Sequence, residues 1–342
     1  MPINYDAPVP PYDLTVFTRR VPTANNLLLS QLFPAEVKDA IQVNFAEITK
    51  TNRTAKFRAP DGRIHVADRD GGSTKVVNMM PLSDSRNQGE YERLKREMQR
   101  LGGSRFEVLE QAAYDDAQDL TTYVQNRVEL ALGDVLVDGV FSPAELGGVT
   151  VDFGVPANHL ITAGTAWSNT AADGLGNLIA ACDTYETTNG FRPGFGITDR
   201  ATMRNFLKQT SIIAAVKGTN TGVTEISLAD ATGTLEKYGI PTEWHVYETQ
   251  LDVDGVTTRV IPLNKVILGP PNKTDLITFR FGTTATAMEL VDSNESDLSF
   301  SEAPGIVGVT VKEGPPFREF TFVDAIGLPL LKNARLLMVL SV

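Results

Sequence analysis

One long helix constrains the fold of this 342-residue chain more than any other feature of its sequence. Between residues 106 and 137, apolar side chains recur every three or four positions, which is the period of one helical face. The stripe consists of Phe106, Leu109, Ala113, Ala117, Leu120, Val124, Val128, Ala131 and Val135. A helix of roughly 30 residues is about 45 Å long. Because the stripe lacks sustained Leu, Ile or Val at heptad positions, we expect the helix to lie across a sheet rather than in a coiled coil.

The segments after this helix alternate between helix and strand and then become mainly β. We expect a helix in "AWSNTAADGLGNLIAACDTYETTNG", capped by Ser168 or Asn169, followed by a buried strand and by a second helix with Asp199 as its N-cap. From Ile240 onward the pattern predicts strands, including "TATAMELV" and the C-terminal "LLMVLSV", with a tight turn at Asp254-Gly255. This order of elements indicates a mixed fold of helices and sheets.

The part of the chain before the long helix offers few residues for a core of its own. Residues 1–30 contain five prolines, so we expect an extended arm. Alternation through Ile41, Val43 and Phe45 predicts a strand that leads into a hairpin. The segment "SDSRNQGEYERLKREMQRLGGSR", residues 83–105, is mainly basic and has few apolar anchors. We expect it to form a solvated or partner-facing helix and linker.

The hairpin "KFRAPDGRIHVADRDGGSTKVV", residues 56–77, turns at Pro60-Asp61-Gly62 and has very little to bury. Its strands carry many charges against few apolar residues: Lys56, Arg58, Arg63, Asp68 and Arg69 against Phe57, Ile64 and Val66. An isolated two-stranded hairpin is marginally stable in water. This hairpin is therefore either a mobile surface loop or an arm that lies on a partner molecule.

Composition excludes several classes of protein. The formal charge of −11, from 31 basic and 42 acidic residues, argues against a general affinity for nucleic acid phosphates. The single cysteine, Cys182, permits no disulfide within the chain, and we expect it to be buried in a helix in a protein of the reducing cytosol. The N-terminus lacks the pattern of a secretory signal peptide, and no apolar run reaches the roughly 18 residues of a membrane span.

No motif predicts an enzyme. "GLGNLIAA" has isoleucine where a dinucleotide-binding loop needs a third small residue, and "DVDG" and "DRDG" lack the later glutamate of a calcium loop. His65, His159 and His245 lack paired metal-ligand spacing, and Asp115, Asp116 and Asp119 are typical of a solvated helix face. We therefore predict no catalytic, cofactor-binding or metal site. A deep pocket with convergent perturbed carboxylates or histidines would instead favour an α/β enzyme.

Three stretches give the chain a resemblance to a known family: "GGVTVDFGVPANHLITAGTAWS", "PLNKVILGPPN" and, most specifically, "PPFREFTFVDAIGLPLL". With the order of arm, hairpin, long helix, α/β region and late strands, they make the chain resemble the lambda-type major capsid protein E family of tailed bacteriophages. The arm and hairpin match in layout rather than in residues. The resemblance implies an α+β fold of the Hong Kong 97 type. It places an N-terminal arm at 1–42, an extended loop and linker at 43–100, a peripheral domain with a spine helix at 101–170 and 266–318, and an axial domain at 171–265 and 319–342.

The same resemblance implies a function. The chain would be a major capsid protein that assembles as pentamers and hexamers into an icosahedral virion shell around packaged double-stranded DNA, without sequence-specific binding, in the bacterial cytoplasm. Its other implied partners are a separate scaffolding protein, a portal and a decoration protein. The hairpin would lie on a neighbouring subunit, with Lys56, Arg58, Arg63 and Arg69 as intersubunit contacts to acidic surfaces. A tail-tube or head-completion protein is the alternative, but the long helix and chain length argue against a tube.

Overall fold

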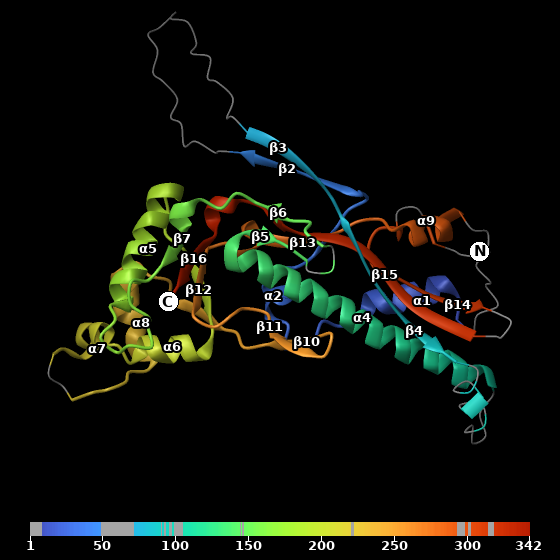
Figure 1. The fold of residues 1–342 in the computed structure, drawn as a ribbon, viewed down its shortest axis with the longest axis horizontal. Coiled ribbons are helices and arrows are strands. Elements are labelled where there is room, and N and C mark those ends of the chain that lie inside the picture. The colour runs from blue at the N-terminus through green and yellow to red at the C-terminus, as the bar shows by residue number, and fades with distance from the viewer. Residues whose placement is uncertain are drawn as a thin grey trace, which may run out of the picture.

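The structure is a computed structural model that describes residues 9–48, 72–89, 91, 94–95, 98, 105–143, 145, 147–219, 222–292, 298–299, 302–313 and 318–342. The long helix predicted between residues 106 and 137 is confirmed as α4 (Arg105–Asp138). It lies across a sheet, as its stripe predicts, and buries Leu120, Val124 and Val135 against it (Figure 1). A second sheet with its own helices lies beyond the C-terminal end of α4.

The first sheet is built around one long strand, β15 (Arg318–Leu331), which pairs antiparallel with three others. The members of this sheet besides β15 are β1 (Glu36–Val37), β4 (Met80–Gln88), β13 (Ile277–Phe281) and β14 (Val307–Glu313). Side chains of β15 alternate in burial from Glu319 to Val323, with the odd-numbered ones inside. The alternation is that of a sheet whose one face packs on a helix, here α4.

Strand β4 corrects the first part of the expectation that residues 83–105 form a helix and linker, whereas the described residues Tyr91, Leu94, Lys95 and Met98 of this stretch are helical. Residues Met80 to Gln88 pair with β15 from Gly327 to Glu319, so every residue of β4 has a partner in the ladder. The partner strand lies more than two hundred residues away in sequence, and no local pattern could reveal it. Non-local pairing therefore overrides the weak helical character of this stretch.

Residues Pro11–Arg20 form helix α1, where the sequence predicted an extended arm. Pro11 lies in the first turn, where its missing N–H has no partner to lose. Leu14 is fully buried, and the Thr15 hydroxyl donates a hydrogen bond of 3.1 Å to the carbonyl of Gly308 in β14. A Cβ at Gly308 would lie 2.7 Å from Thr18, so glycine permits the close approach of α1. The segment is thus part of a core.

A third correction concerns "TATAMELV", which forms helix α9 (Ala285–Asp292) instead of a strand. The Thr284 hydroxyl accepts a hydrogen bond of 3.1 Å from the amide of Ala287 and so satisfies one free donor of the first turn. Ala287 and Leu290, three positions apart, are both fully buried against β14. A short apolar run contains both the two-residue spacing of a strand and the three-residue spacing of a helix, so the run alone does not determine the element. Packing against β14 selects the helix here.

The second sheet has the order β7 (Leu160–Thr162), β16 (Met338–Ser341), β12 (Lys265–Gly269), β8 (Phe195–Thr198) and β9 (Glu243–Val246). Its helices are α5 (Gly174–Asn189), α6 (Arg200–Leu207), α7 (Thr210–Lys217) and α8 (Leu228–Lys237). Asp199 caps α6 as predicted, through the amide of Thr202 at 2.8 Å. Helix α5 begins later than expected, because Asp173 rather than Ser168 or Asn169 caps it.

The two sheets divide the chain differently from the boundaries expected at 265/266 and 318/319. Strand β12 belongs to the second sheet, whereas β15 belongs entirely to the first. Only β16, at the end of the chain, returns to the second sheet, where it pairs with β12 and β7. The chain therefore crosses between the two sheets after β15.

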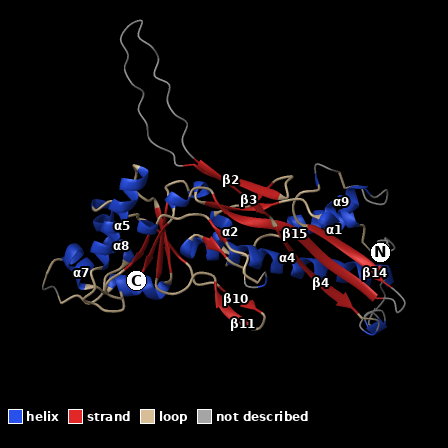
Figure 2. Cartoon of the chain, turned by 45° about the horizontal axis from the view of Figure 1, so that its top comes forward, coloured by secondary structure: helices blue, strands red, loops and turns tan. Residues whose placement is uncertain are grey.

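Three two-stranded ribbons and several short helices complete the described chain. The ribbons are β2 (Gln42–Ile48) with β3 (Gly72–Asn78), β5 (Val140–Phe141) with β6 (Val151–Asp152), and β10 (Gln250–Val253) with β11 (Val256–Arg259). The short helices are α2 (Leu28–Leu32), η2 (Ala157–His159), η3 (Lys273–Asp275) and η5 (Ala334–Leu336). The turn predicted at Asp254-Gly255 is confirmed, since both residues have positive φ. Ribbon β2–β3 runs out from the body in both views (Figures 1 and 2).

Candidate functional site

The four basic residues predicted to make contacts, Lys56, Arg58, Arg63 and Arg69, lie outside the described residues. What the structure describes is the root of their hairpin, the ribbon β2–β3. Its register runs from Gln42 opposite Asn78 to Ile48 opposite Gly72, and the strand predicted through Ile41, Val43 and Phe45 is confirmed as β2. Val43 is buried, but Ile41 and Val76 have 65% and 56% of their surface exposed. The ribbon thus presents apolar surface that the body of its own chain does not cover.

The ribbon is held to the first sheet where β3 continues into β4. Met79, between the two strands, is buried, and its amide donates a hydrogen bond of 3.0 Å to the carbonyl of Ile41. Gly282, which follows β13, lies directly against this root. A Cβ at Gly282 would be 2.2 Å from the carbonyl oxygen of Ala40 and 2.6 Å from the sulfur of Met79. A glycine at this position therefore allows the root of the ribbon to seat on the sheet.

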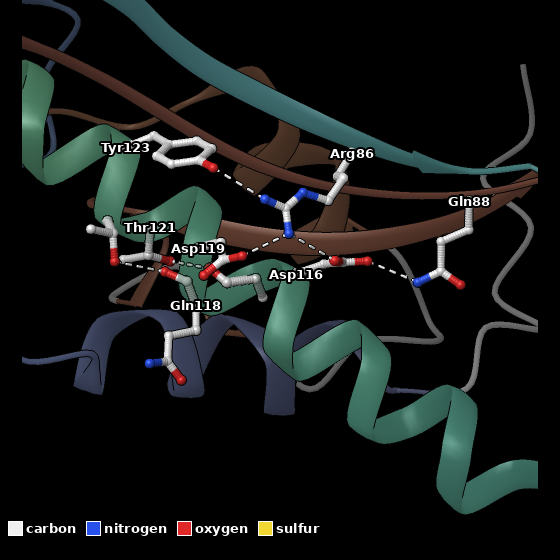
Figure 3. A network of polar contacts seen from close by, with 9 residues as sticks. Arg86, Gln88, Asp116, Gln118, Asp119, Thr121 and Tyr123 are labelled. Atoms are coloured by element: carbon white, nitrogen blue, oxygen red, sulfur yellow. Dashed lines mark hydrogen bonds and ion pairs between the residues drawn. The ribbon is translucent and has the colours of Figure 1, made fainter. Parts of the chain in front are cut away.

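A polar network fixes β4 to the N-terminal half of α4 (Figure 3). One guanidinium nitrogen of Arg86 lies 3.1 Å from Asp116 and 2.7 Å from Asp119, and the other donates to the Tyr123 hydroxyl at 3.1 Å. Gln88 donates to the second oxygen of Asp116 at 2.8 Å. The hydrogen bonds that the guanidinium donates to Asp119 and, to a smaller extent, to Asp116 raise the pKa of Arg86. We name these five residues the Arg86 network.

The expectation that Asp115, Asp116 and Asp119 form a solvated face is confirmed for Asp115 and Asp119 and wrong for Asp116. Asp115 is exposed and Asp119 keeps 55% of its side chain in solvent, but only 4% of the Asp116 side chain is accessible. Positions 116, 119 and 123 fall on one face of the helix, and that face meets β4. The spacing was visible in the sequence, but the partner Arg86 was not, because its strand had been assigned to a helix and linker.

A second polar site, centred on Glu129, joins three segments at the C-terminal half of α4. Glu129 is fully buried and its carboxylate accepts four hydrogen bonds, which we call the Glu129 cluster. The donors are the amides of Leu29 (2.7 Å) and Ser30 (2.8 Å), the Ser30 hydroxyl (2.6 Å) and the Tyr247 hydroxyl (2.5 Å). Burial and the adjacent carboxylate raise the pKa of Tyr247, so the phenol stays protonated and donates. The cluster connects α2, α4 and the chain that follows β9.

The remaining polar residues considered in the sequence have structural partners. The ring nitrogens of His159 lie 3.0 Å from the carbonyl of Leu337 and 3.0 Å from the Thr188 hydroxyl, and burial lowers its pKa. His245 is 3.0 Å from Glu243 in β9. Cys182 is buried in α5 as predicted, and burial raises its pKa to about 12. The "GLGNLIAA" stretch forms the first turns of α5.

Among the residues that the structure describes, no three His, Cys, Asp or Glu side chains are grouped as metal ligands would be. His65 and the "DRDG" stretch lie outside the described residues. Within the described part of the chain, no helix is both long and apolar enough to cross a membrane. The two polar sites on α4 hold protein segments together, so the feature that points outward is the β2–β3 ribbon.

Comparisons with known proteins agree with this architecture. Residues 11–298 match the model of a family described as phage major capsid protein E. No protein with curated annotation matches the sequence. Among solved structures, a prophage protein of Escherichia coli CFT073 named as a capsid protein has a TM-score of 0.57 at 13% identity, with 98% of this chain and 99% of that chain covered.

Two further solved structures are similar to this chain over almost all of its length. A phage-related protein of Bordetella bronchiseptica RB50 has a TM-score of 0.52 at 15% identity, with 97% of each chain covered. The capsid of Myoviridae phage XM1 has a TM-score of 0.50 at 11% identity, with 94% of this chain and 92% of that chain covered. At these identities the likeness concerns the fold, which is the predicted α+β fold of the Hong Kong 97 type.

Proposed function

The chain belongs to the phage major capsid protein E family, and we propose that copies of it assemble as pentamers and hexamers into an icosahedral shell that encloses packaged double-stranded DNA. The observation that supports this assembly best is the ribbon β2–β3. It runs out from the body, with 65% of Ile41 and 56% of Val76 exposed. Two-stranded ribbons gain stability by packing on another surface, and neighbouring subunits of a shell provide one.

The hairpin beyond this ribbon is proposed to lie on a neighbouring subunit. Lys56, Arg58, Arg63 and Arg69 are its proposed contact residues, facing acidic surfaces of that neighbour. Each exposed ion pair contributes only about 0.2–1 kcal/mol, but the contact recurs in every subunit of a closed shell. The first sheet with α4 is the proposed peripheral domain, and the second sheet with α5 to α8 is the proposed axial domain around the five-fold and six-fold positions.

The proposed partners outside the shell follow from the family. They are a scaffolding protein, a portal and a decoration protein, with assembly in the cytoplasm of the bacterial host. The net charge of −11 supports a shell that encloses DNA without binding it tightly or by sequence. Measurement of DNA binding by empty shells at physiological salt tests this point, and tight binding would contradict it.

Electron microscopy of negatively stained particles tests the proposed assembly. The protein is expressed alone and together with the reading frames adjacent to its gene, and closed shells or rings of five and six subunits are expected. The variant carrying Arg63→Glu and Arg69→Glu should yield folded subunits that assemble poorly. Stacked rings that form a tube would favour a tail protein, and subunits that remain monomeric in both preparations would contradict a shell.

A further inference from the structure

A groove opens where three elements meet: the beginning of β4, the middle of α4 and the hairpin β10–β11. Its volume is about 810 Å³. The apolar side chains that line it come from these three elements, from β5 and from the first sheet behind them: Leu82, Val124, Leu130, Phe141, Leu251 and Phe279. Tyr123 stands at its edge with its ring half exposed. A hollow with apolar walls on an exposed surface is typical of an interaction site.

The rim of the groove is acidic. Four carboxylates, those of Asp84, Glu145, Asp252 and Asp254, and one guanidinium, that of Arg127, give it a net charge of −3. Arg127 pairs with Glu145 at 2.6 Å, whereas none of the three aspartates makes an ion pair with a described residue. Asp84 accepts a hydrogen bond from the amide of Ser85 (2.8 Å) and Asp252 from that of Gly255 (2.7 Å). Backbone contacts therefore orient two carboxylates that have no cation among the described residues.

We propose that this groove receives residues 49–71 of a second copy of the chain. This segment holds six basic and three acidic residues, a net charge of +3 in a protein whose total charge is −11. Its basic residues alternate with the apolar Phe57, Ile64 and Val66. Such a segment matches an acidic rim over an apolar floor in both charge and hydrophobicity. The assignment rests on the proposed shell function, because it names the surface on which the hairpin of a neighbour lies.

The direction of the ribbon indicates that the segment in the groove comes from a second copy rather than from the same chain. In both views, β2–β3 leaves the body on the side opposite to the hairpin β10–β11, which forms one wall of the groove (Figures 1 and 2). Segment 49–71 is joined to the outer end of this ribbon, seven residues beyond its root. Seven residues of strand extend about 23 Å. The outer end of the ribbon is therefore directed away from the β10–β11 wall of the groove in its own subunit.

Neutralising the rim tests the electrostatic part of the inference. In the variant with Asp84→Asn, Asp252→Asn and Asp254→Asn, the amide oxygens can still accept from Ser85 and Gly255, and asparagine tolerates the φ of 52° at position 254. We expect the critical subunit concentration for shell assembly to rise roughly three- to tenfold, which corresponds to a total loss of about 0.6–1.4 kcal/mol per subunit for the three exposed contacts. At about 1 M salt, where the Debye length is ~3 Å, the difference should vanish.

A matched control removes the same charge elsewhere. Glu236→Gln, Glu289→Gln and Asp292→Asn together also remove three negative charges, from exposed positions of α8 and α9 that do not line the groove. This control should assemble at the wild-type concentration. Shells that form from the groove variant at the wild-type concentration would overturn the inference and leave the proposed shell function standing. Failure of the wild-type chain to form any shell or ring would overturn both.

Cysteine cross-linking tests whether the contact joins two copies. Ser83 is exposed at the groove, and Cys182 is too buried to compete. The pair Ser83→Cys and Arg63→Cys should give disulfide-linked multimers when assembled particles are oxidised. A mixture of the two single-cysteine proteins should give dimers after co-assembly. The pair Glu236→Cys and Arg63→Cys, with its first thiol on α8, is the control and should give none. Bonds that form only within one chain, or equally in the control, would overturn the inference.

Discussion

The two halves of α4 are each fixed by hydrogen-bonded carboxylates, in one half near the surface and in the other in the core. At the N-terminal half, the Arg86 network joins the helix to β4 with a guanidinium that is 37% exposed. At the C-terminal half, the Glu129 cluster joins the helix to α2 and to Tyr247 with a carboxylate that is fully buried. An exposed ion pair exchanges water for a partner and gains little, whereas a buried carboxylate without its donors leaves several groups unpaired at once. The helix should therefore be held mainly at its C-terminal half.

The largest effect is expected at Glu129. Glu129→Gln keeps the shape of the side chain but replaces one carboxylate oxygen by an NH2 group. This group cannot accept a hydrogen bond, so at least one of the backbone amides or hydroxyls that donate to Glu129 loses its acceptor. We expect the free energy of unfolding of the unassembled subunit to fall by about 2–4 kcal/mol. Urea unfolding followed by the fluorescence of Trp167 and Trp244 measures it. A loss below that of the Arg86 variant described below would contradict the comparison.

Tyr247→Phe removes one donor of the same cluster and leaves the carboxylate three others. The phenyl ring fills the same space, so the expected loss is about 1.5–3 kcal/mol, the range for a hydrogen bond to a charged acceptor. The same urea titration measures it. Glu129→Gln combined with Tyr247→Phe should cost less than the sum of the two single changes, because the partners are shared. Strict additivity would show that the two groups do not interact.

Arg86→Met keeps most of the aliphatic stem and removes the guanidinium from two carboxylates and one hydroxyl. Because Asp116 stays buried and still accepts from Gln88, we expect a loss of about 1 kcal/mol, which is modest for a network of three contacts. The loss should shrink in high salt, since part of it is an exposed ion pair. A loss that does not change between low and high salt would show that burial of Asp116 dominates this end as well.

The smallest effect is expected for Asp119→Asn. Its carboxylate is mostly in solvent, and among the described residues its ion-pair partner is Arg86, which would keep its contact with Asp116. The expected change in the free energy of unfolding is at most about 0.5 kcal/mol. Asp116→Asn is the matched comparison, because it removes the same charge from a buried position of the same network. Equal losses in the two variants would contradict the importance of burial.

The sequence predicted those parts of the fold that local patterns determine. The stripe of α4, the cap at Asp199 and the turn at Asp254-Gly255 each involve residues close to one another in the chain, and each is confirmed. The parts that were wrong depend on distant partners. Strand β4 requires β15, helix α1 requires the space above Gly308, and α9 requires a core made by β14. None of these partners can be recognised from the segment itself.

The polar sites on α4 were missed for a related reason. Glu129 follows Val128 and precedes Leu132 by three positions, so an acid on the apolar face was visible in the sequence. Its donors, however, come from α2 and from Tyr247, which lie 99 to 118 residues away in the sequence. A charged residue on an apolar stripe indicates a buried polar site, but the fold alone supplies its partners. The basic residues of the hairpin stay a prediction, because they lie outside the described residues.

The register of β2–β3 sets rules for how this ribbon can change in length among related capsid proteins. Its strands match residue for residue over seven pairs. One residue added to each strand would lengthen the ribbon by about 3.3 Å but turn every side chain beyond the insertion to the opposite face. Two residues added to each strand would lengthen it by about 7 Å and keep the faces. The length of this ribbon should therefore vary among related proteins in steps of two residues per strand. Such steps change the distance that the ribbon spans and leave the side chains of each face on the same side.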